Sequence, residues 1–161
     1  MVDMIYNRTS SDVDEAKRIR IEKVQKSIPL TEAEIETLNR GTVTIDTLNR
    51  IEAKEEELTI LLNKNGYWNT PVETHTWTYA DIFDINAFNR ILNNLNLLRD
   101  AFFTFTTTPR TPTPRYHFSN FNDLEKILHD LEIMVDDIKS LYRECGAFEC
   151  GQEEKFERLY R

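Results

Sequence analysis

An apolar stripe near the C-terminal end of the chain is the feature that most constrains its fold. Between residues 121 and 142, large apolar side chains recur at alternating spacings of three and four residues, and a second row lies beside them at a spacing of seven: Phe121, Leu124, Leu128, Leu131, Val135, Ile138 and Tyr142, with Ile127, Met134 and Leu141. This spacing predicts one side of an α-helix of about 22 residues, capped by Ser119 or Asn120. Because the stripe is wider than the seam of a dimeric coiled coil, it favours a helix packed in a bundle.

Four further segments have helical periodicity and helix-end signals. Ser11 and Asp14 have the spacing of a helix start, Thr31 and Glu34 form a capping box, and Gly41 is a stop signal. We expect the charged run 52–57 to be the solvated side of one of these helices and Asp130 to lie on the solvated face of the last one. The chain is therefore predicted to be mainly α, a bundle of four or five helices, with the additional helices at residues 12–26, 31–41, 46–65 and 84–102.

Three segments do not have helical character. Aromatic residues and alternating threonines at 67–80 predict an extended or β segment, and the threonine- and proline-rich residues 104–115 predict a connecting loop, with a polyproline II ligand as the alternative reading of its PxxP spacing. Cys145-Gly146 and Cys150-Gly151 predict a small C-terminal hairpin, in which the two cysteines are free thiols, a disulfide or half of a metal site. We expect residues 1–66 to form an N-terminal helical region that packs as one unit with residues 67–161, which hold the extended segment, two long helices and the hairpin.

The charge and glycine content argue against several functions. The 161 residues include 20 basic and 28 acidic side chains, a net charge of −8, and this excess is spread evenly over both halves. A net negative chain has no general attraction for nucleic acid or for anionic membranes, and no apolar run is long enough for a membrane span. The four glycines form no phosphate-binding loop, and the HExxH and GxSxG motifs are absent. We therefore expect no cofactor, no metal and no catalytic residues.

Aromatic residues are the best candidates for a binding surface. Twelve of the aromatic side chains fall between positions 67 and 121. Aromatic side chains are enriched at the centres of protein interfaces because they bury a large area with few rotatable bonds. The alternative is that they fill the core beneath long loops. The aromatic residues that fall in predicted loops are the interface candidates: Tyr67, Trp68, Trp77 and Tyr116.

Several short strings, taken in order, carry a resemblance to a known group of proteins: Tyr6-Asn7-Arg8-Thr9 with Asp12-Val13, Thr47-Leu48-Asn49-Arg50-Ile51-Glu52, Trp77-Thr78 with Asp81-Ile82, Asn89-Arg90-Ile91, Leu98-Arg99, Thr107-Thr108-Pro109 and Asn122-Asp123-Leu124-Glu125-Lys126-Ile127-Leu128. In this order the chain resembles small virion structural proteins of tailed phages and prophages of Gram-positive bacteria, which are associated with the baseplate or fibre region of the distal tail. The resemblance extends over residues 6–151. The paired hairpin of those proteins is usually Ser-Gly-like, whereas this chain has two Cys-Gly pairs.

The resemblance implies a non-enzymatic structural component that is made in the host cytoplasm and located in the virion. Its partners would be other tail or baseplate proteins, and the chain would be a homo-oligomer or part of a symmetric multi-copy assembly. Two alternatives remain open. The net charge of −8 suits an acidic helical regulator or adaptor that binds a host or phage protein. His117 and His129, with nearby carboxylates, are the candidates for a metal-assisted hydrolase.

Overall fold

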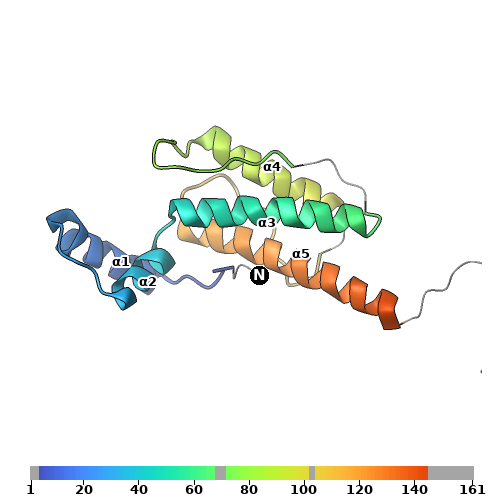
Figure 1. Ribbon diagram of the computed structural model, residues 1–161, viewed down its shortest axis with the longest axis horizontal. Coiled ribbons are helices and arrows are strands. Elements are labelled where there is room, and N and C mark those ends of the chain that lie inside the picture. Colours follow the sequence, from blue (N-terminus) through green and yellow to red (C-terminus); the bar gives the residue numbers. More distant parts are fainter. Residues whose placement is uncertain (1–3, 68–71, 102–103, 145–161) are drawn as a thin grey trace, which may run out of the picture.

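The computed structural model describes residues 4–67, 72–101 and 104–144, with the side chains of the last helix described as far as residue 137. This part of the chain is mainly helical and contains no strand, which confirms the predicted helical bundle (Figure 1). The elements in chain order are α1 (Ser10–Glu22), a 3₁₀ turn (Val24–Lys26), α2 (Glu32–Gly41), α3 (Ile45–Lys64), α4 (Ile85–Ala101) and α5 (Phe118–Glu144).

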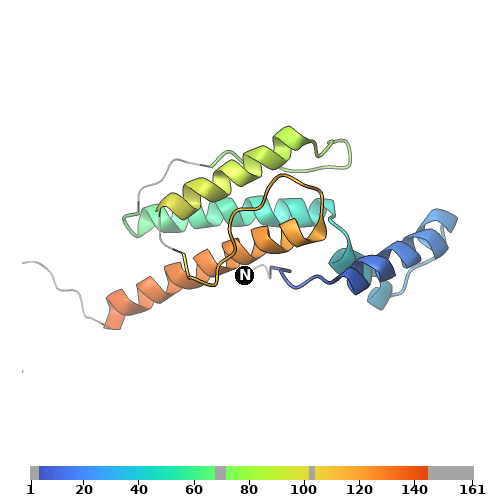
Figure 2. The same ribbon diagram turned by 180° about the vertical axis from the view of Figure 1, so that it is seen from behind.

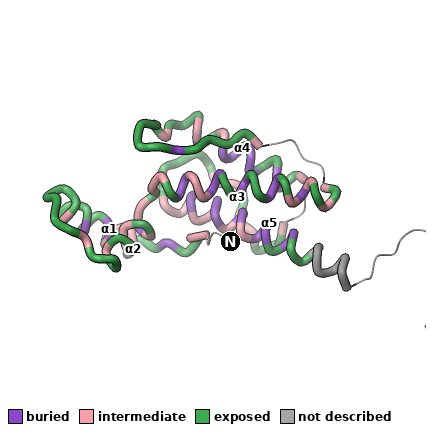
Figure 3. Tube along the Cα trace, in the orientation of Figure 1, coloured by how far each residue is buried: buried purple, intermediate pink, exposed green. Residues whose placement is uncertain are grey.

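The core lies between α3, α4 and α5, which pack side by side as a three-helix bundle (Figures 1 and 2). Each helix contributes an apolar stripe to this core, and the purple segments of Figure 3 follow those stripes. Full burial of one such aliphatic or aromatic side chain contributes about 1.5–3 kcal/mol. The side chains with no exposed surface include Leu58 and Leu62 from α3, Phe88, Ile91, Leu95 and Leu98 from α4, and Leu124, Ile127, Leu128 and Leu131 from α5.

Helices α1 and α2 form a separate hairpin that projects from the end of the bundle where α3 begins (Figures 1 and 2). The two helices approach closely at Gly41, the last residue of α2. A Cβ atom at this position would lie 2.2 Å from the backbone oxygen of Asp12 and 2.5 Å from the Cβ of Ala16. The hairpin therefore depends on a residue without a side chain at this contact.

Capping residues explain where the helices begin. The predicted capping box of Thr31 and Glu34 is confirmed, with Lys23 adding an ion pair. These contacts lower the pKa of the Glu34 carboxyl to about 2, and the hydrogen bond from Lys23 has the largest effect, followed by that from Thr31. Helix α1 begins at Ser10, two residues before the predicted start at residue 12, because Thr9 and not Ser11 is its cap.

The extended or β segment predicted near 67–80 is not seen. The described residues of this region, 67 and 72–80, contain no strand. The backbone groups of Glu73, His75 and Trp77 pair with side chains of α3 and α4, so no second strand is needed to satisfy them. The predicted C-terminal hairpin and both cysteines lie outside the described residues.

The solvated face predicted for residues 52–57 is wrong at three positions. Glu52, Lys54 and Glu55 are buried, whereas Ala53, Glu56 and Glu57 are exposed. Asp130 on α5 is also buried, where it accepts a hydrogen bond from Thr108 and pairs with Lys126. Loops and neighbouring helices cover these charged groups. Glu52 and Lys54 have ion-pair partners on other helices, Arg90 of α4 and Glu132 of α5, whereas the partner of Asp130 lies on its own helix.

Candidate functional site

A groove lies between the α1–α2 hairpin and the adjacent end of the bundle. It encloses about 690 Å³, which is within the range of ligand and peptide pockets. One wall comes from α1, and the floor comes from the start of α3, the loop before α4 and the start of α5. We call it the aromatic groove, after the lining residues Trp77, Phe83, Tyr116, Phe118 and Phe121.

A chain of ring contacts holds the floor of the aromatic groove in place. Trp77 meets Phe83 edge-on, with 5.3 Å between ring centroids, and Phe83 meets Tyr116 in the same manner at 5.7 Å. Beneath them, Phe88 stacks on Phe121 at 5.3 Å, with the two rings almost parallel. Such aromatic pairs each contribute about 0.5–1.5 kcal/mol beyond their buried area. The floor is therefore continuous with the core of the bundle and preformed.

Beside the groove, the loop before α4 and the first residue of α4 expose three large apolar side chains, which we call the loop patch: Tyr79 and Ile82 from the loop and Ile85 from α4. Tyr79 is 99% exposed and Ile82 is 84% exposed. A tight turn positions them, because the Asp81 carboxylate accepts hydrogen bonds from the backbone and the hydroxyl of Thr78, each at 2.7 Å. These hydrogen bonds lower the pKa of Asp81 below its ordinary value.

The four sequence-predicted interface residues have different positions. Trp77 and Tyr116 both line the aromatic groove; Tyr116 is 59% exposed, whereas Trp77 is only 6% exposed and donates its indole N–H to Glu52. Tyr67 is partly buried and packs against the core of the bundle. Trp68 lies outside the described residues. Their role as interface residues stays a prediction.

Sequence reasoning missed the loop patch and Phe83. Ile82 is an isolated apolar residue in a loop and carries no periodic signal, whereas Tyr79 lies in the same aromatic segment as Trp77 and met the same criterion. The spacing of Thr78 and Asp81 was an available signal, since a hydroxyl and a carboxylate three residues apart form a compact turn that exposes the residues between and after them.

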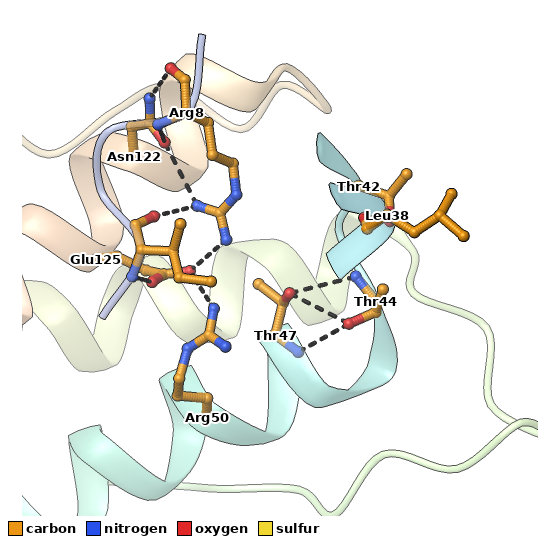
Figure 4. Close-up of polar contacts among 9 residues, drawn as sticks. Arg8, Leu38, Thr42, Thr44, Thr47, Arg50, Asn122 and Glu125 are labelled. Carbon is orange, nitrogen blue, oxygen red and sulfur yellow. Dashed lines mark hydrogen bonds and ion pairs between the residues drawn. The ribbon is translucent and has the colours of Figure 1, made fainter. Parts of the chain in front are cut away.

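A buried cluster of charges anchors the N-terminal segment and the hairpin to the bundle (Figure 4). The Glu125 carboxylate on α5 has no exposed surface and accepts from the guanidinium groups of Arg8 and Arg50, each at 2.8 Å. Its second oxygen accepts from the backbone N–H of Ile5. Two arginines on one carboxylate leave a net positive charge, and the Nε atoms of both arginines are buried without a hydrogen-bond partner among the described residues.

Asn122, one turn before Glu125, fixes the same segment by pairing with its backbone. Its side chain accepts from the Arg8 N–H at 3.2 Å and donates to the Arg8 carbonyl at 2.8 Å (Figure 4). One amide thus satisfies both backbone groups of a residue that has no strand partner. The anchor joins three parts of the chain that are distant in sequence: the residues before α1, the first half of α3 and the first half of α5.

The histidines proposed for metal-assisted hydrolysis are occupied by other contacts. The Nδ1 atom of His117 lies 2.7 Å from the Ser119 hydroxyl, and the ring of His129 stacks on Tyr6 with 4.9 Å between centroids. Across residues 4–67, 72–101 and 104–144, no three histidine, cysteine or acidic side chains are grouped so that they would hold a metal ion. None of the helices in this part of the chain has the length and apolar character of a membrane span.

Comparison of the chain with protein-family descriptions, with curated proteins and with solved structures found no match. The site is therefore interpreted from its own geometry and from the sequence strings described above.

Proposed function

We propose that this chain is a non-enzymatic structural component of a phage tail, associated with the baseplate or fibre, and that it acts through protein–protein interfaces in a multi-copy assembly. The observation that carries the interface part of the proposal is the loop patch next to the aromatic groove. The assignment to a phage tail is supported by the ordered strings that run from Tyr6 to Leu128.

The loop patch has the composition and stiffness of a binding surface. Tyr79 and Ile82 would bury most of their area on contact with a partner. The Thr78–Asp81 turn holds the backbone around both, so little backbone freedom would be lost on binding. The adjoining aromatic groove adds Tyr116 and Phe118, and exposed aromatic anchors beside a concave surface are typical of interface hot spots.

Buried carboxylates among the described residues link different helices, which supports a structural role for these charged groups. Glu125 joins the N-terminal segment to α3 and α5, Glu52 joins α3 to α4, and Glu132 joins α5 to Lys54 of α3. Each carboxylate thus pairs with a cation of a different element and fixes the arrangement of the helices. A rigid subunit with a fixed surface is what a repeated assembly requires.

The test is incorporation into particles of the phage or prophage that encodes the chain. The variant Tyr79→Ser with Ile82→Ser should keep its helical content and melting temperature but fail to enter purified tails when it replaces the wild type. The matched control is Ile60→Ser, an equally simple change at a 60% exposed position of α3, which should be incorporated normally. Equal incorporation of both variants would refute the role of the loop patch, and complete infectious particles formed without this chain would refute the structural role.

The alternative, an acidic regulator or adaptor, is favoured by the net charge of −8. This alternative predicts a different result when the wild-type chain is used to capture partners from infected cells. Affinity capture with the wild-type chain from infected cells would then recover a DNA-binding or host protein and no tail subunits, whereas a structural component should recover tail subunits.

A further inference from the structure

Residues 72–77 lie along α3 and α4 as a segment that we call the strap. Two asparagines hold its ends. Asn94 of α4 accepts from the N–H of Glu73 at 3.3 Å and donates to its carbonyl at 2.9 Å, and Asn49 of α3 pairs in the same way with Trp77, at 2.7 and 3.1 Å. Each amide side chain takes the place that a neighbouring strand would take in a sheet. The strap is therefore attached to the bundle mainly through side chains.

Glu52 of α3 holds the middle of the strap. Its carboxylate accepts from the backbone N–H of His75 at 2.6 Å and from the indole N–H of Trp77 at 2.7 Å. Arg90 of α4 pairs with the same carboxylate at 2.7 Å and also donates to the carbonyl of Glu73. The middle of the strap is thus held by one carboxylate and one guanidinium, in addition to the two asparagines at its ends.

Glu55 lies next to this cluster, and the contacts of the strap do not use it. Its side chain is fully buried, one oxygen accepts from the Asn94 amide at 2.8 Å, and the other oxygen has no partner among the described residues. Burial raises the pKa of the Glu55 carboxyl well above its ordinary value; the Asn94 hydrogen bond and Arg90 oppose this, and the negative charge of Glu52 reinforces it. Burial therefore shifts the equilibrium of this carboxyl group toward its neutral, protonated form.

We propose that the strap is a pH-sensitive closure, which stays on α3 and α4 while Glu55 is protonated and opens when Glu55 loses its proton as the pH rises. Once Glu55 is ionised, it and Glu52 compete for the single guanidinium of Arg90, and Glu55 also needs water around its second oxygen. Lifting the strap admits that water, because Asn94 links Glu55 directly to Glu73.

The other charged groups around Glu55 do not compensate for its ionisation. The strap itself brings Glu73 and His75, of which His75 lies 3.5 Å from Asp81. From α5, the charged groups that reach α3 are already paired: Glu125 with Arg50 and Glu132 with Lys54. Opening is limited to the strap because Trp77 is its only fully buried apolar side chain, whereas separation of the helices would expose the whole core.

Nuclear magnetic resonance of the full chain with labelled glutamate, asparagine and tryptophan tests this coupling. The Glu55 carboxyl should titrate well above the range of an ordinary glutamate. Over the same pH interval, the signals of the Trp77 indole N–H and the Asn94 amide should change to those of a solvated group, while the methyl signals of Leu58 and Leu128 in the core stay in place. Because one proton is released on opening, the ratio of open to closed molecules should rise about tenfold per pH unit over the range in which Glu55 is protonated in the closed form and ionised in the open form.

Two substitutions complete the test. Glu55→Gln, which cannot ionise, should keep the strap closed over the whole range, and Glu56→Gln, at the exposed neighbouring position, should behave like the wild type. The proposal is overturned if Glu55 titrates in the ordinary range with the strap closed, if the strap of Glu55→Gln opens at the same pH as the wild type, or if the core signals change together with those of the strap. The wild-type titration decides the question even if Glu55→Gln does not fold.

Discussion

Replacement of Glu125 by glutamine should be one of the most destabilising single changes in this chain. The substitution keeps the shape of the side chain but removes the one negative charge that contacts Arg8 and Arg50 among the described residues; the side chains of these arginines are 1% and 14% exposed. It also turns an acceptor toward the Ile5 N–H into a possible donor. Removing one partner of a buried ion pair costs about 3–5 kcal/mol, because the remaining charge is left without compensation.

Urea unfolding followed by circular dichroism measures this cost. With a slope of about 2 kcal/mol per molar urea, a loss of that size shifts the midpoint by about 2 M. The matched control is Glu56→Gln on the exposed side of α3, which should change the free energy of unfolding by less than about 0.5 kcal/mol. A triple variant, Arg8→Met with Arg50→Met and Glu125→Leu, should recover most of the loss, since no buried charge then remains in the anchor. If Glu125→Gln costs less than about 1 kcal/mol, the anchor does not stabilise the fold in the way described.

Three further predictions concern the hairpin, the core and the helix caps. Gly41→Ala should destabilise the chain by about 1–3 kcal/mol in urea unfolding, because the added Cβ meets the backbone of α1 at 2.2 Å; no loss would mean that α1 and α2 are not in close contact. Leu128→Ala should cost about 2–5 kcal/mol in the same assay through the cavity that it leaves in the core, and a loss below 1 kcal/mol would place Leu128 outside it. The folded-state pKa of Glu34, about 2, is below its ordinary value of 4.5, so its contribution to stability is complete above that ordinary value and is lost as the pH falls toward 2. Thermal melts should therefore show a smaller loss on acidification for Glu34→Gln than for the wild type, and parallel curves would contradict this.

The helices were predictable because their signals are local. The capping box of Thr31 and Glu34 and the apolar stripe of α5 each lie within a few turns of the chain. Asp84 before α4 is a further case, since its carboxylate accepts from the N–H of Ala87 at 2.8 Å. Such patterns determine a helix whatever surrounds it.

The polar interior could not be predicted in the same way, because its partners are distant in sequence. The run that includes Glu52 and Glu55 has the composition of a solvated face, yet the strap and α4 cover it. Asn49 holds Trp77, which lies 28 positions away, and Glu125 holds Arg8, which lies 117 positions away. The alternating threonines of the strap favoured a strand, but Thr74 and Thr76 are exposed and the backbone between them is satisfied by a side chain.

The aromatic groove and the loop patch also differ in how far they could be predicted from the sequence. Trp77 and Tyr116 were selected as aromatic residues in loops, and the structure brings both to one groove. Phe83 joins them through ring contacts to each, and this could not be read from a sequence in which the three residues are up to 39 positions apart. The loop patch follows from the Thr78–Asp81 turn, whose effect on exposure depends on the strap and α4 that flank it.

Quantitative mass spectrometry of purified particles is the most direct test of the structural role. Particles of the phage that encodes this chain should contain it in several copies, at a constant ratio to the other tail proteins and resistant to washing with high salt. A chain that is absent from the particles, or that remains with host proteins in the lysate after they are purified, would contradict the account.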